Sequence, residues 1–158
     1  MENHQPIAIR ACDAPARKIP SVYPEPFASM MTGRIKHTLG DLFKIKNFGV
    51  NITRLSPGAR SALLHRHKLQ EEFIYVLEGE PVLVTDVDEI QLYPGMCAGF
   101  IPEGPAHQLV NRSENDVLYL EIGDRTPGDE VTYPIDDLVA VSAPNGQWAF
   151  THKNGEAY

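Results

Sequence analysis

The chain has 158 residues, 42% hydrophobic and 22% charged, which is the length and composition of one soluble globular domain. Its formal net charge of −7 disfavours a nucleic-acid backbone or an anionic membrane as a partner, because either would require a basic surface. No apolar run approaches the roughly 20 residues that a membrane-spanning helix needs, so the sequence disfavours an integral helical membrane protein.

Residues 1–48 are predicted to form an extended arm that packs on the body of the protein. Of the 13 prolines, five fall within residues 1–26, where they prevent a regular helix or a central strand. Near the end of the arm, residues 41–44 are predicted to form a short helical turn. The first residues lack the cationic start and apolar core of a secretory signal. Because two cysteines are also too few for a disulfide framework, the sequence predicts a cytoplasmic protein.

Residues 49–123 are predicted to form the core of an all-β domain. Short strand-like segments recur at spacings of about 8–12 residues, and each ends in, or within two residues of, Gly, Pro, Asn or Asp, a pattern typical of a sandwich or barrel. No long segment has the 3.6-residue period of an amphipathic helix, which disfavours a helical bundle or a Rossmann fold. The predicted strands are 49–55, 72–79, 81–86, 89–94, 96–101, 106–111 and 116–123.

Two of these strands are apolar at consecutive positions, at residues 73–77 (FIYVL) and, apart from Glu121, at residues 117–122 (VLYLEI). Both faces of such strands need cover. One face can line a barrel interior, and the other can pack against the arm, the C-terminal tail or another subunit. The surplus of apolar residues predicts a homodimer.

Residues 124–158 are predicted to be an extension of the same domain. Strand-like pieces alternate there with turn signals at 144–146 and 154–155. We therefore expect extra strands or a strap on the barrel, and not a second domain.

Two histidines, His65 and His67, stand one residue apart just before a predicted strand. In an extended segment, residues i and i+2 point to the same face, so the two imidazoles can converge on one point. Glu72 opens the next strand and can place a carboxylate beside them. Glu71 is the rival carboxylate, although strand alternation points it to the opposite face. Taken alone, the pattern also fits a polar strand end that faces solvent.

A third histidine, His107, follows a loop that contains proline and glycine. Residues 58–79 have the spacing G-x6-H-x-H-x4-E-x6-G, and residues 95–111 have the spacing G-x6-P-x-G-x2-H-x3-N. These two patterns resemble the two signature motifs of the cupin superfamily, a resemblance that extends in strand pattern over about residues 49–123.

The resemblance implies a jelly-roll barrel, also called a double-stranded β-helix. Carried over position by position, it implies that His65, His67, Glu72 and His107 bind one divalent transition metal ion. The donor chemistry agrees, because three imidazoles and one carboxylate suit Fe, Mn, Ni, Co or Zn rather than an ion that demands thiolates. Four protein ligands on an octahedral ion leave two positions for a small molecule in the barrel.

The first functional hypothesis is a metal-dependent enzyme that acts on a small polar or anionic metabolite. The sequence is similar to a group of small single-domain bacterial cupins regarded as sugar-phosphate-isomerase-like, and this resemblance favours an isomerase. Two alternatives stay open: an Fe(II) dioxygenase or a lyase or decarboxylase, and a non-catalytic metal-dependent small-molecule binding or sensor protein. The sequence shows no dedicated general base.

The remaining motif residues are predicted to have structural roles. Gly79, Gly95 and Gly104 are expected to supply turns and positive-φ positions that aim the ligands. Asn111 is expected to cap a strand end, and Cys97 to be a small buried hydrophobic residue rather than a nucleophile.

Arg60 and Arg66 lie near the first motif, where they could meet an anionic substrate. Arg66 falls on the strand face opposite the two histidines, which favours a solvent or interface role. His4, His37 and His152 have no partner at ligand spacing and are expected to have surface or packing roles.

Overall fold

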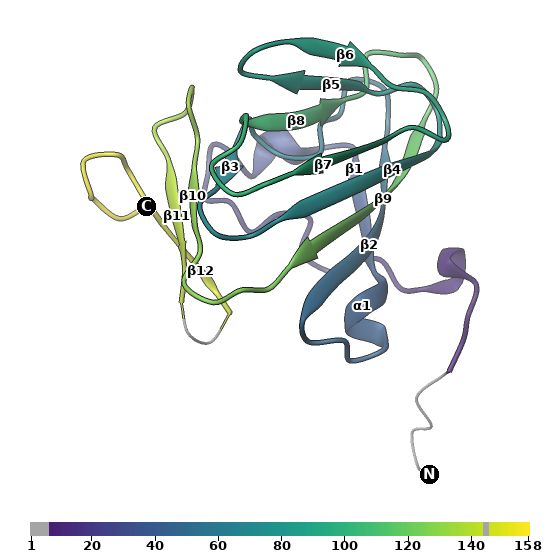
Figure 1. Cartoon of the computed structure of the whole chain (residues 1–158), viewed down its shortest axis with the longest axis horizontal. Helices are drawn as coiled ribbons and strands as arrows, with labels where there is room; N and C mark the ends of the chain where they lie inside the picture. The colour runs from purple at the N-terminus through teal and green to yellow at the C-terminus, as the bar shows by residue number, and fades with distance from the viewer. Residues whose placement is uncertain (1–6, 144–145) are drawn as a thin grey trace.

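Three antiparallel sheets make up the body of the protein in the computed structural model, which describes residues 7–143 and 146–158 (Figure 1). The large sheet contains, in spatial order, β1 (Arg34–Thr38), β2 (Phe48–Leu55), β9 (Val117–Asp124), β4 (Glu72–Glu78) and β7 (Cys97–Phe100). The four-stranded sheet contains β12 (Trp148–Thr151), β11 (Val139–Ser142), β10 (Glu130–Thr132) and β3 (Arg66–His67). The three-stranded sheet contains β6 (Glu89–Gln91), β5 (Val82–Thr85) and β8 (His107–Val110).

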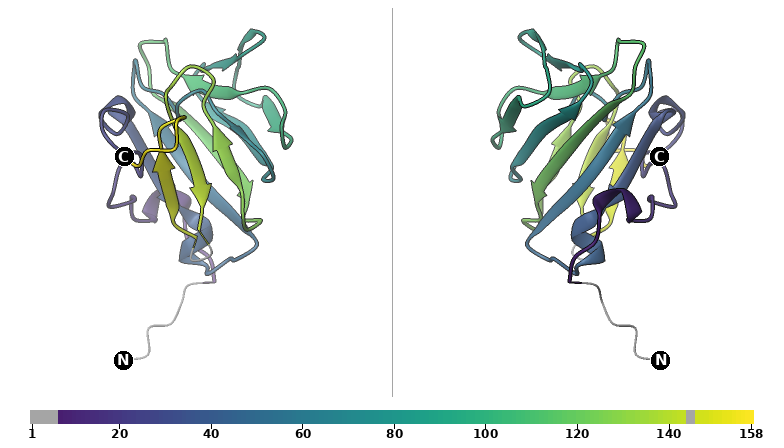
Figure 2. Two further views of the ribbon diagram at one scale, coloured as in Figure 1. Left: turned by 90° about the vertical axis from the view of Figure 1, so that its left-hand side faces the viewer. Right: turned by 90° about the vertical axis from the view of Figure 1, so that its right-hand side faces the viewer.

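The two smaller sheets together form the wall opposite the large sheet. Isolated bridges pair Arg60 with Val110 and His65 with His107, which connects the chain around β3 to β8. Figure 2 shows the resulting barrel from two sides, with the N-terminal segment lying along one flank. The architecture is a jelly-roll barrel, so the predicted all-β fold is confirmed.

All seven predicted core strands are present, and their ends lie within three residues of the predicted ends. The tail also adds strands as expected, because β10, β11 and β12 all lie beyond residue 123. Of the predicted tail turns, residues 154–155 form one, with Gly155 at φ 91°. Residues 144–145 of the other turn lie outside the described residues.

The N-terminal segment differs from the prediction near its end. Residues 34–38 leave the arm and pair with β2 as β1, so the large sheet begins before residue 49. No proline follows residue 26 until residue 57, which leaves this part free to join a sheet. The helical turn lies slightly earlier than predicted, as α1 (Leu39–Leu42). No helix among the described residues is long and apolar enough to cross a membrane.

The rest of the arm is irregular, as its prolines predict, with 3₁₀ turns at Ala11–Asp13 and Ser29–Met31. Ala16 forms a bridge with His37, and the Arg17 amide donates to the Lys36 carbonyl (2.7 Å). The arm therefore runs beside β1 as a short extension of the large sheet.

Two buried apolar clusters fill the barrel, and each buried aliphatic side chain contributes roughly 1.5–3 kcal/mol. The first joins the large and three-stranded sheets through Leu55, Ile74, Val76, Val117, Tyr119, Leu83 and Leu109. The second joins the arm and the C-terminal part of the chain through Phe27, Met31, Val131, Tyr133, Leu138 and Ala140. The histidines of the predicted metal site lie where these two clusters meet.

The predicted glycine roles are only partly confirmed. Gly79 has φ 78°, and a Cβ there would lie 2.5 Å from the Asp116 carbonyl oxygen, so only glycine fits this turn after β4. Gly95 also has a positive φ of 91°. Gly104 forms the predicted turn, because its N–H donates to the Ile101 carbonyl (3.0 Å), but the positive φ of that loop belongs to Glu103. A Cβ at Gly104 would lie 2.9 Å from the Ile101 carbonyl oxygen.

Candidate metal centre

The backbone brings the three motif histidines together from two separate strands. His65 and His107 form a doubly hydrogen-bonded bridge, with N–H to carbonyl distances of 3.2 and 2.8 Å. Their rings consequently lie side by side, with centroids 4.7 Å apart. His67 follows on β3, and its ring centroid is 5.3 Å from that of His65. The predicted i, i+2 arrangement therefore places both imidazoles on one face.

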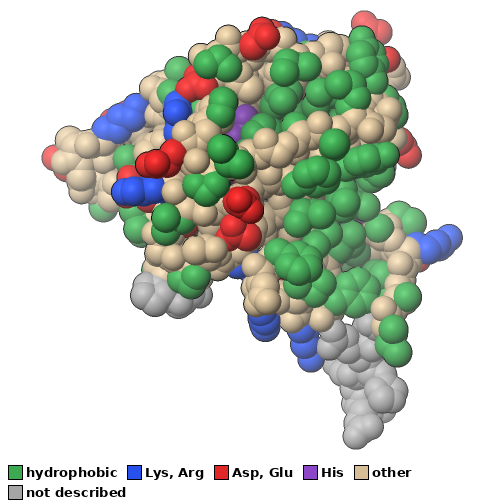
Figure 3. Space-filling model, in the orientation of Figure 1, with side chains coloured by type: hydrophobic (Ala, Val, Ile, Leu, Met, Phe, Trp, Pro, Cys, Tyr) green, Lys and Arg blue, Asp and Glu red, His purple; other side chains and the backbone are tan. Residues whose placement is uncertain are grey.

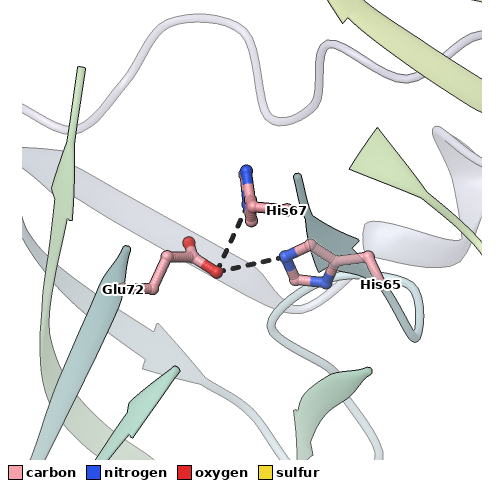
Figure 4. Close-up of side chains that lie close together, drawn as sticks. All are labelled: His65, His67 and Glu72. Carbon is pink, nitrogen blue, oxygen red and sulfur yellow. Dashed lines mark ion pairs between the residues drawn. The ribbon is translucent and has the colours of Figure 1, made fainter. Parts of the chain in front are cut away.

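Glu72 is the first residue of β4 and points into the barrel toward these imidazoles (Figure 4). Its Oε2 atom lies 2.9 Å from His107 Nε2, 3.3 Å from His65 Nε2 and 3.4 Å from His67 Nε2. The ligand atoms of His65, His67 and Glu72 all lie within 4.8 Å of one another, close enough to hold one metal ion. All four residues singled out from the sequence therefore meet at one point.

The far side of each imidazole faces a hydrogen-bond acceptor. His65 Nδ1 is 2.8 Å from the Leu63 carbonyl oxygen, and His67 Nδ1 is 2.5 Å from an Asp129 carboxylate oxygen. His107 Nδ1 lies 3.4 Å from the Pro105 carbonyl oxygen. When the imidazoles bind a metal ion, these contacts hold the ring proton on Nδ1 and leave the Nε2 lone pair of each ring free for the ion.

Three imidazole nitrogens and one carboxylate oxygen thus converge on one point, and this arrangement suits a cation. A divalent ion fits this site because nitrogen and oxygen ligand atoms are present and point to one place. Hydrogen-bond acceptors at Nδ1 also fix the orientation of each imidazole, as is usual for histidines that bind a metal.

Without a metal, protons satisfy the same cluster. Burial disfavours the Glu72 carboxylate, but hydrogen bonds from His107, His65 and His67 outweigh burial and hold the pKa of Glu72 well below its usual value. Burial also lowers the pKa of His67, yet Glu72 and Asp129 overcome it and raise that pKa to about 9. Burial lowers the pKa of His107, so this residue stays neutral at physiological pH.

Asp129 is a further residue of the candidate centre that sequence reasoning missed. It is fully buried beside β10, and its second oxygen accepts the backbone N–H groups of Lys68, Leu69 and Gln70 at 2.8–3.3 Å. Its partner His67 lies on β3, which pairs with β10 through Val131. Only this long-range register brings the two together, and no local spacing signals it.

A cavity of about 230 Å³ opens beside the cluster. The size suits a small metabolite, because pockets for drug-sized ligands have about 300–1,000 Å³. One wall is aromatic and includes Tyr23, Tyr133 and Trp148, while Arg17 and Lys36 lie among its charged residues. Ring stacking also fixes the position of His107, because the Phe100 ring lies parallel to it at a centroid separation of 3.5 Å.

The other predicted residues lie away from the cluster. Glu71 is exposed, Arg66 pairs with Asp86, and neither lies in the metal cluster. Asn111 is completely buried and donates from Nδ2 to the carbonyl oxygens of Leu55 and Asn115, which confirms its structural role.

Cys97 is exposed, so the expected buried position is wrong. Its strand β7 turns Ala98 and Phe100 toward the core, and alternation leaves Cys97 on the outer face. His37 Nδ1 contacts the Ala14 carbonyl oxygen (2.7 Å) and His152 contacts Asp137 (2.8 Å), which agrees with packing and surface roles. His4 lies outside the described residues.

A small antiparallel β-barrel with an inward-facing cluster of histidines and a glutamate defines the class of this protein. The family model of the cupin domain matches residues 51–123, which include both motifs. The chain is similar to a sugar phosphate isomerase from a cupin superfamily, from Silicibacter pomeroyi, whose crystal structure is known. The two sequences are 39% identical, and the structures align with a TM-score of 0.88 over 96% of each chain. The chain therefore belongs to the cupin superfamily.

Two further solved structures show the same fold. A putative sugar phosphate isomerase from Acidithiobacillus ferrooxidans is 29% identical, with a TM-score of 0.71 over 79% of this chain and 80% of that one. The polyketide cyclase RemF from Streptomyces resistomycificus is 23% identical, with a TM-score of 0.63 over 82% and 85% of the two chains, and shares the fold alone. No curated protein matches the chain.

Proposed function

We propose that this protein is a metal-dependent enzyme that interconverts isomers of a small sugar phosphate. The observation that carries the proposal is the convergence of His65, His67, His107 and Glu72 beside a cavity of metabolite size. The names of two similar proteins, both sugar phosphate isomerases by name, support the choice of reaction.

In this proposal the three histidines and Glu72 hold one divalent ion of the group Fe, Mn, Ni, Co or Zn. When bound, such an ion supplies Lewis acidity that stabilises negative charge developing on substrate oxygens. Asp129 keeps His67 in the tautomer that presents Nε2 to the centre.

The aromatic wall would bind and enclose the sugar. Burial raises the pKa of both Tyr23 and Tyr133, so their hydroxyl groups stay protonated at neutral pH and can donate hydrogen bonds to sugar oxygens. Trp148 and Phe150 pack against the second buried apolar cluster, which contains Tyr133, and exclude water from that side of the cavity.

The test begins with protein purified without added metal, whose bound metal is identified by elemental analysis. The protein is then incubated with a panel of aldose and ketose phosphates, and isomerisation is followed by NMR. We expect interconversion of at least one pair, loss of turnover after chelation and recovery when the identified metal returns.

Two outcomes would replace the isomerase proposal. Metal-dependent binding of a metabolite with no turnover would favour the non-catalytic binding or sensor protein. Metal-dependent oxygen consumption, or release of carbon dioxide from an added acid, would favour the dioxygenase or the decarboxylase.

We also propose that the protein is a homodimer that associates through the outer face of the large sheet. Phe73 and Tyr75 on β4 are each 39% exposed, and Ile35 on β1 is 46% exposed. Figure 3 shows hydrophobic side chains gathered over this side of the molecule. A contiguous apolar patch on a sheet face is typical of a protein–protein contact.

A further inference from the structure

The cavity beside the metal centre contains two cations that the proposed metal site does not use. Lys36 lies on β1, and Arg17 lies next to it on the arm, where their backbones are hydrogen-bonded. Both side chains line the same cavity as His65, His67 and Glu72. The arm and β1 thus supply a charged wall that is separate in the sequence from both motifs.

The ammonium group of Lys36 is carried close to the metal centre. It pairs with Glu121 on β9, and Glu121 lies opposite Ile74 of the neighbouring strand β4. Glu72 is two residues before Ile74 on β4, so Glu121 and Glu72 are diagonal neighbours, about 7–8 Å apart. The Lys36 ammonium therefore lies one strand away from the metal ligands, on the inner face of the sheet.

Glu121 is already well satisfied by other groups. Asn51 Nδ2 donates to its Oε1 atom (2.9 Å), and the Tyr119 hydroxyl donates to its Oε2 atom (3.0 Å). With two neutral donors and Lys36, this carboxylate does not need a second cation. Its role is to position the Lys36 ammonium.

Arg17 has no such partner. Among residues 7–143 and 146–158, its guanidinium group makes no hydrogen bond and no ion pair. Burial lowers the pKa of Arg17, as does the nearby charge of Arg34, while Asp41 and Glu121 oppose this effect. A half-buried cation that faces a cavity without a partner is costly unless a ligand provides the opposite charge.

The charges of the cavity favour a dianion. Among the residues that line the cavity, the carboxylates of Glu72 and Glu121 balance the cations Arg17 and Lys36, so a divalent metal leaves this lining with two positive charges in excess. A phosphate monoester carries about −1.5 to −2 charges at pH 7 and offers several acceptor oxygens. A monocarboxylate would leave part of the excess uncompensated.

We propose that Arg17 and Lys36 form the subsite for the phosphate group of the substrate, with Glu121 as the residue that positions Lys36. This inference rests on the proposed function, because it assumes that the sugar oxygens face the metal centre. It gives the N-terminal arm a role in substrate binding, as the donor of one of the two cations.

The test compares the affinities of a sugar phosphate and of its neutral sugar. Calorimetric titration of the metal-loaded full chain uses glucose 6-phosphate, ribose 5-phosphate and inorganic phosphate as probes, with glucose and glucuronate as comparisons. We expect Arg17→Gln and Lys36→Gln each to weaken binding of the best phosphate probe about tenfold or more. Binding of glucose and metal content should stay unchanged.

Matched controls separate the subsite from a general loss of charge or of folding. Arg10→Gln removes an exposed cation from the same arm, and Arg54→Gln removes one from the outer face of β2; neither should change phosphate binding. Lys36→Arg keeps the charge and should retain most of the affinity. A melting temperature for each variant identifies any that has lost its fold.

Several results would overturn the subsite. These are unchanged phosphate affinity in both Gln variants, equal losses for glucose and glucose 6-phosphate, tighter binding of glucuronate than of any phosphate probe, or no binding of any phosphate probe by the wild type. The proposed function fails differently: phosphate binding that depends on Arg17 and Lys36 without any isomerisation supports the subsite and ends the isomerase proposal.

Discussion

The two faces of the large sheet carry opposite chemistry although the same strands supply both. At the cavity end, the inner face presents Glu72, Glu121 and Lys36, whereas the outer face presents the apolar side chains of Phe73 and Tyr75. Antiparallel sheets of soluble proteins usually place their apolar side chains inward and their polar ones outward. The reversal agrees with the proposed ligand chemistry on the inner face and with the proposed dimer contact on the outer face.

The inner polar groups tolerate burial because each has several partners. Glu72 contacts three imidazoles, and Glu121 contacts Lys36, Asn51 and Tyr119. A carboxylate left unpaired at such a position would cost several kcal/mol. On the outer face the proposed dimer contact would cover the partly exposed rings of Phe73 and Tyr75.

The largest effect is expected on the inner face, at the metal ligands. Replacing Glu72 by Gln removes the anionic ligand, and replacing His65 by Ala removes a nitrogen ligand. Each change should lower metal affinity by more than about 100-fold, beyond the effect of losing an outer contact. Elemental analysis and a competitive chelator titration measure it. Glu71→Gln is the matched control, and undiminished metal content in His65→Ala would count against the whole site.

A smaller loss is expected when the outer contact of His67 is changed. In Asp129→Asn, an amide nitrogen turned toward His67 would donate to Nδ1 and move the ring proton to Nε2, where it blocks ligation. Metal affinity should fall about 10–100-fold. Asp124→Asn is the control, because Asp124 also accepts a backbone N–H, from Glu71, but contacts no histidine. Equal metal affinity in both variants would show that Asp129 has only a structural role.

The outer face should respond through assembly and not through metal binding. Tyr75→Glu places a charge at the centre of the apolar patch and should weaken self-association about 30-fold or more, the effect of losing a hot-spot residue worth at least about 2 kcal/mol. Sedimentation at micromolar concentration should then show the 17.6 kDa monomer, with unchanged metal content. A wild type that sediments only as a monomer would refute the dimer and leave the cover to the arm and tail.

The sequence predicted this molecule best where the relevant contacts are local. Strand alternation was enough to predict that His65 and His67 share one face, and apolar runs with turn residues were enough to predict the core strands. Cys97 was misplaced because the segment 96–101 is apolar or small at every position. Its inward face therefore depends on the pairing of β7 with β4, in which Ala98 lies opposite Ile74.

The residues that sequence reasoning missed all depend on pairing between distant segments. Asp129 reaches His67 through the register of β10 with β3, and Arg17 reaches the cavity through the arm beside β1. Lys36 on β1 and Glu121 on β9 meet across the intervening strand β2 of the large sheet. A single sequence contains no local signal for such contacts, because loop closure and sheet register determine them together.

The last prediction, a change of about tenfold per pH unit, is the pH dependence of the inner face. The pKa of His67 in the metal-free protein is raised from 6.5 to about 9, because Glu72 and Asp129 outweigh the effect of burial. A ligating imidazole must lose its proton, so apparent metal affinity should rise about tenfold per pH unit from pH 7 to 9 and then level off.

The stability of the metal-free protein should change in the opposite direction. A raised pKa stabilises the fold fully below pH 6.5, and this contribution is lost between pH 6.5 and 9. Chelator titrations and melting curves across this range measure both slopes, with His152→Gln as a control that should leave them unchanged. Metal affinity that is flat between pH 7 and 9 would show that His67 carries no proton there, and that the cluster is satisfied in another way.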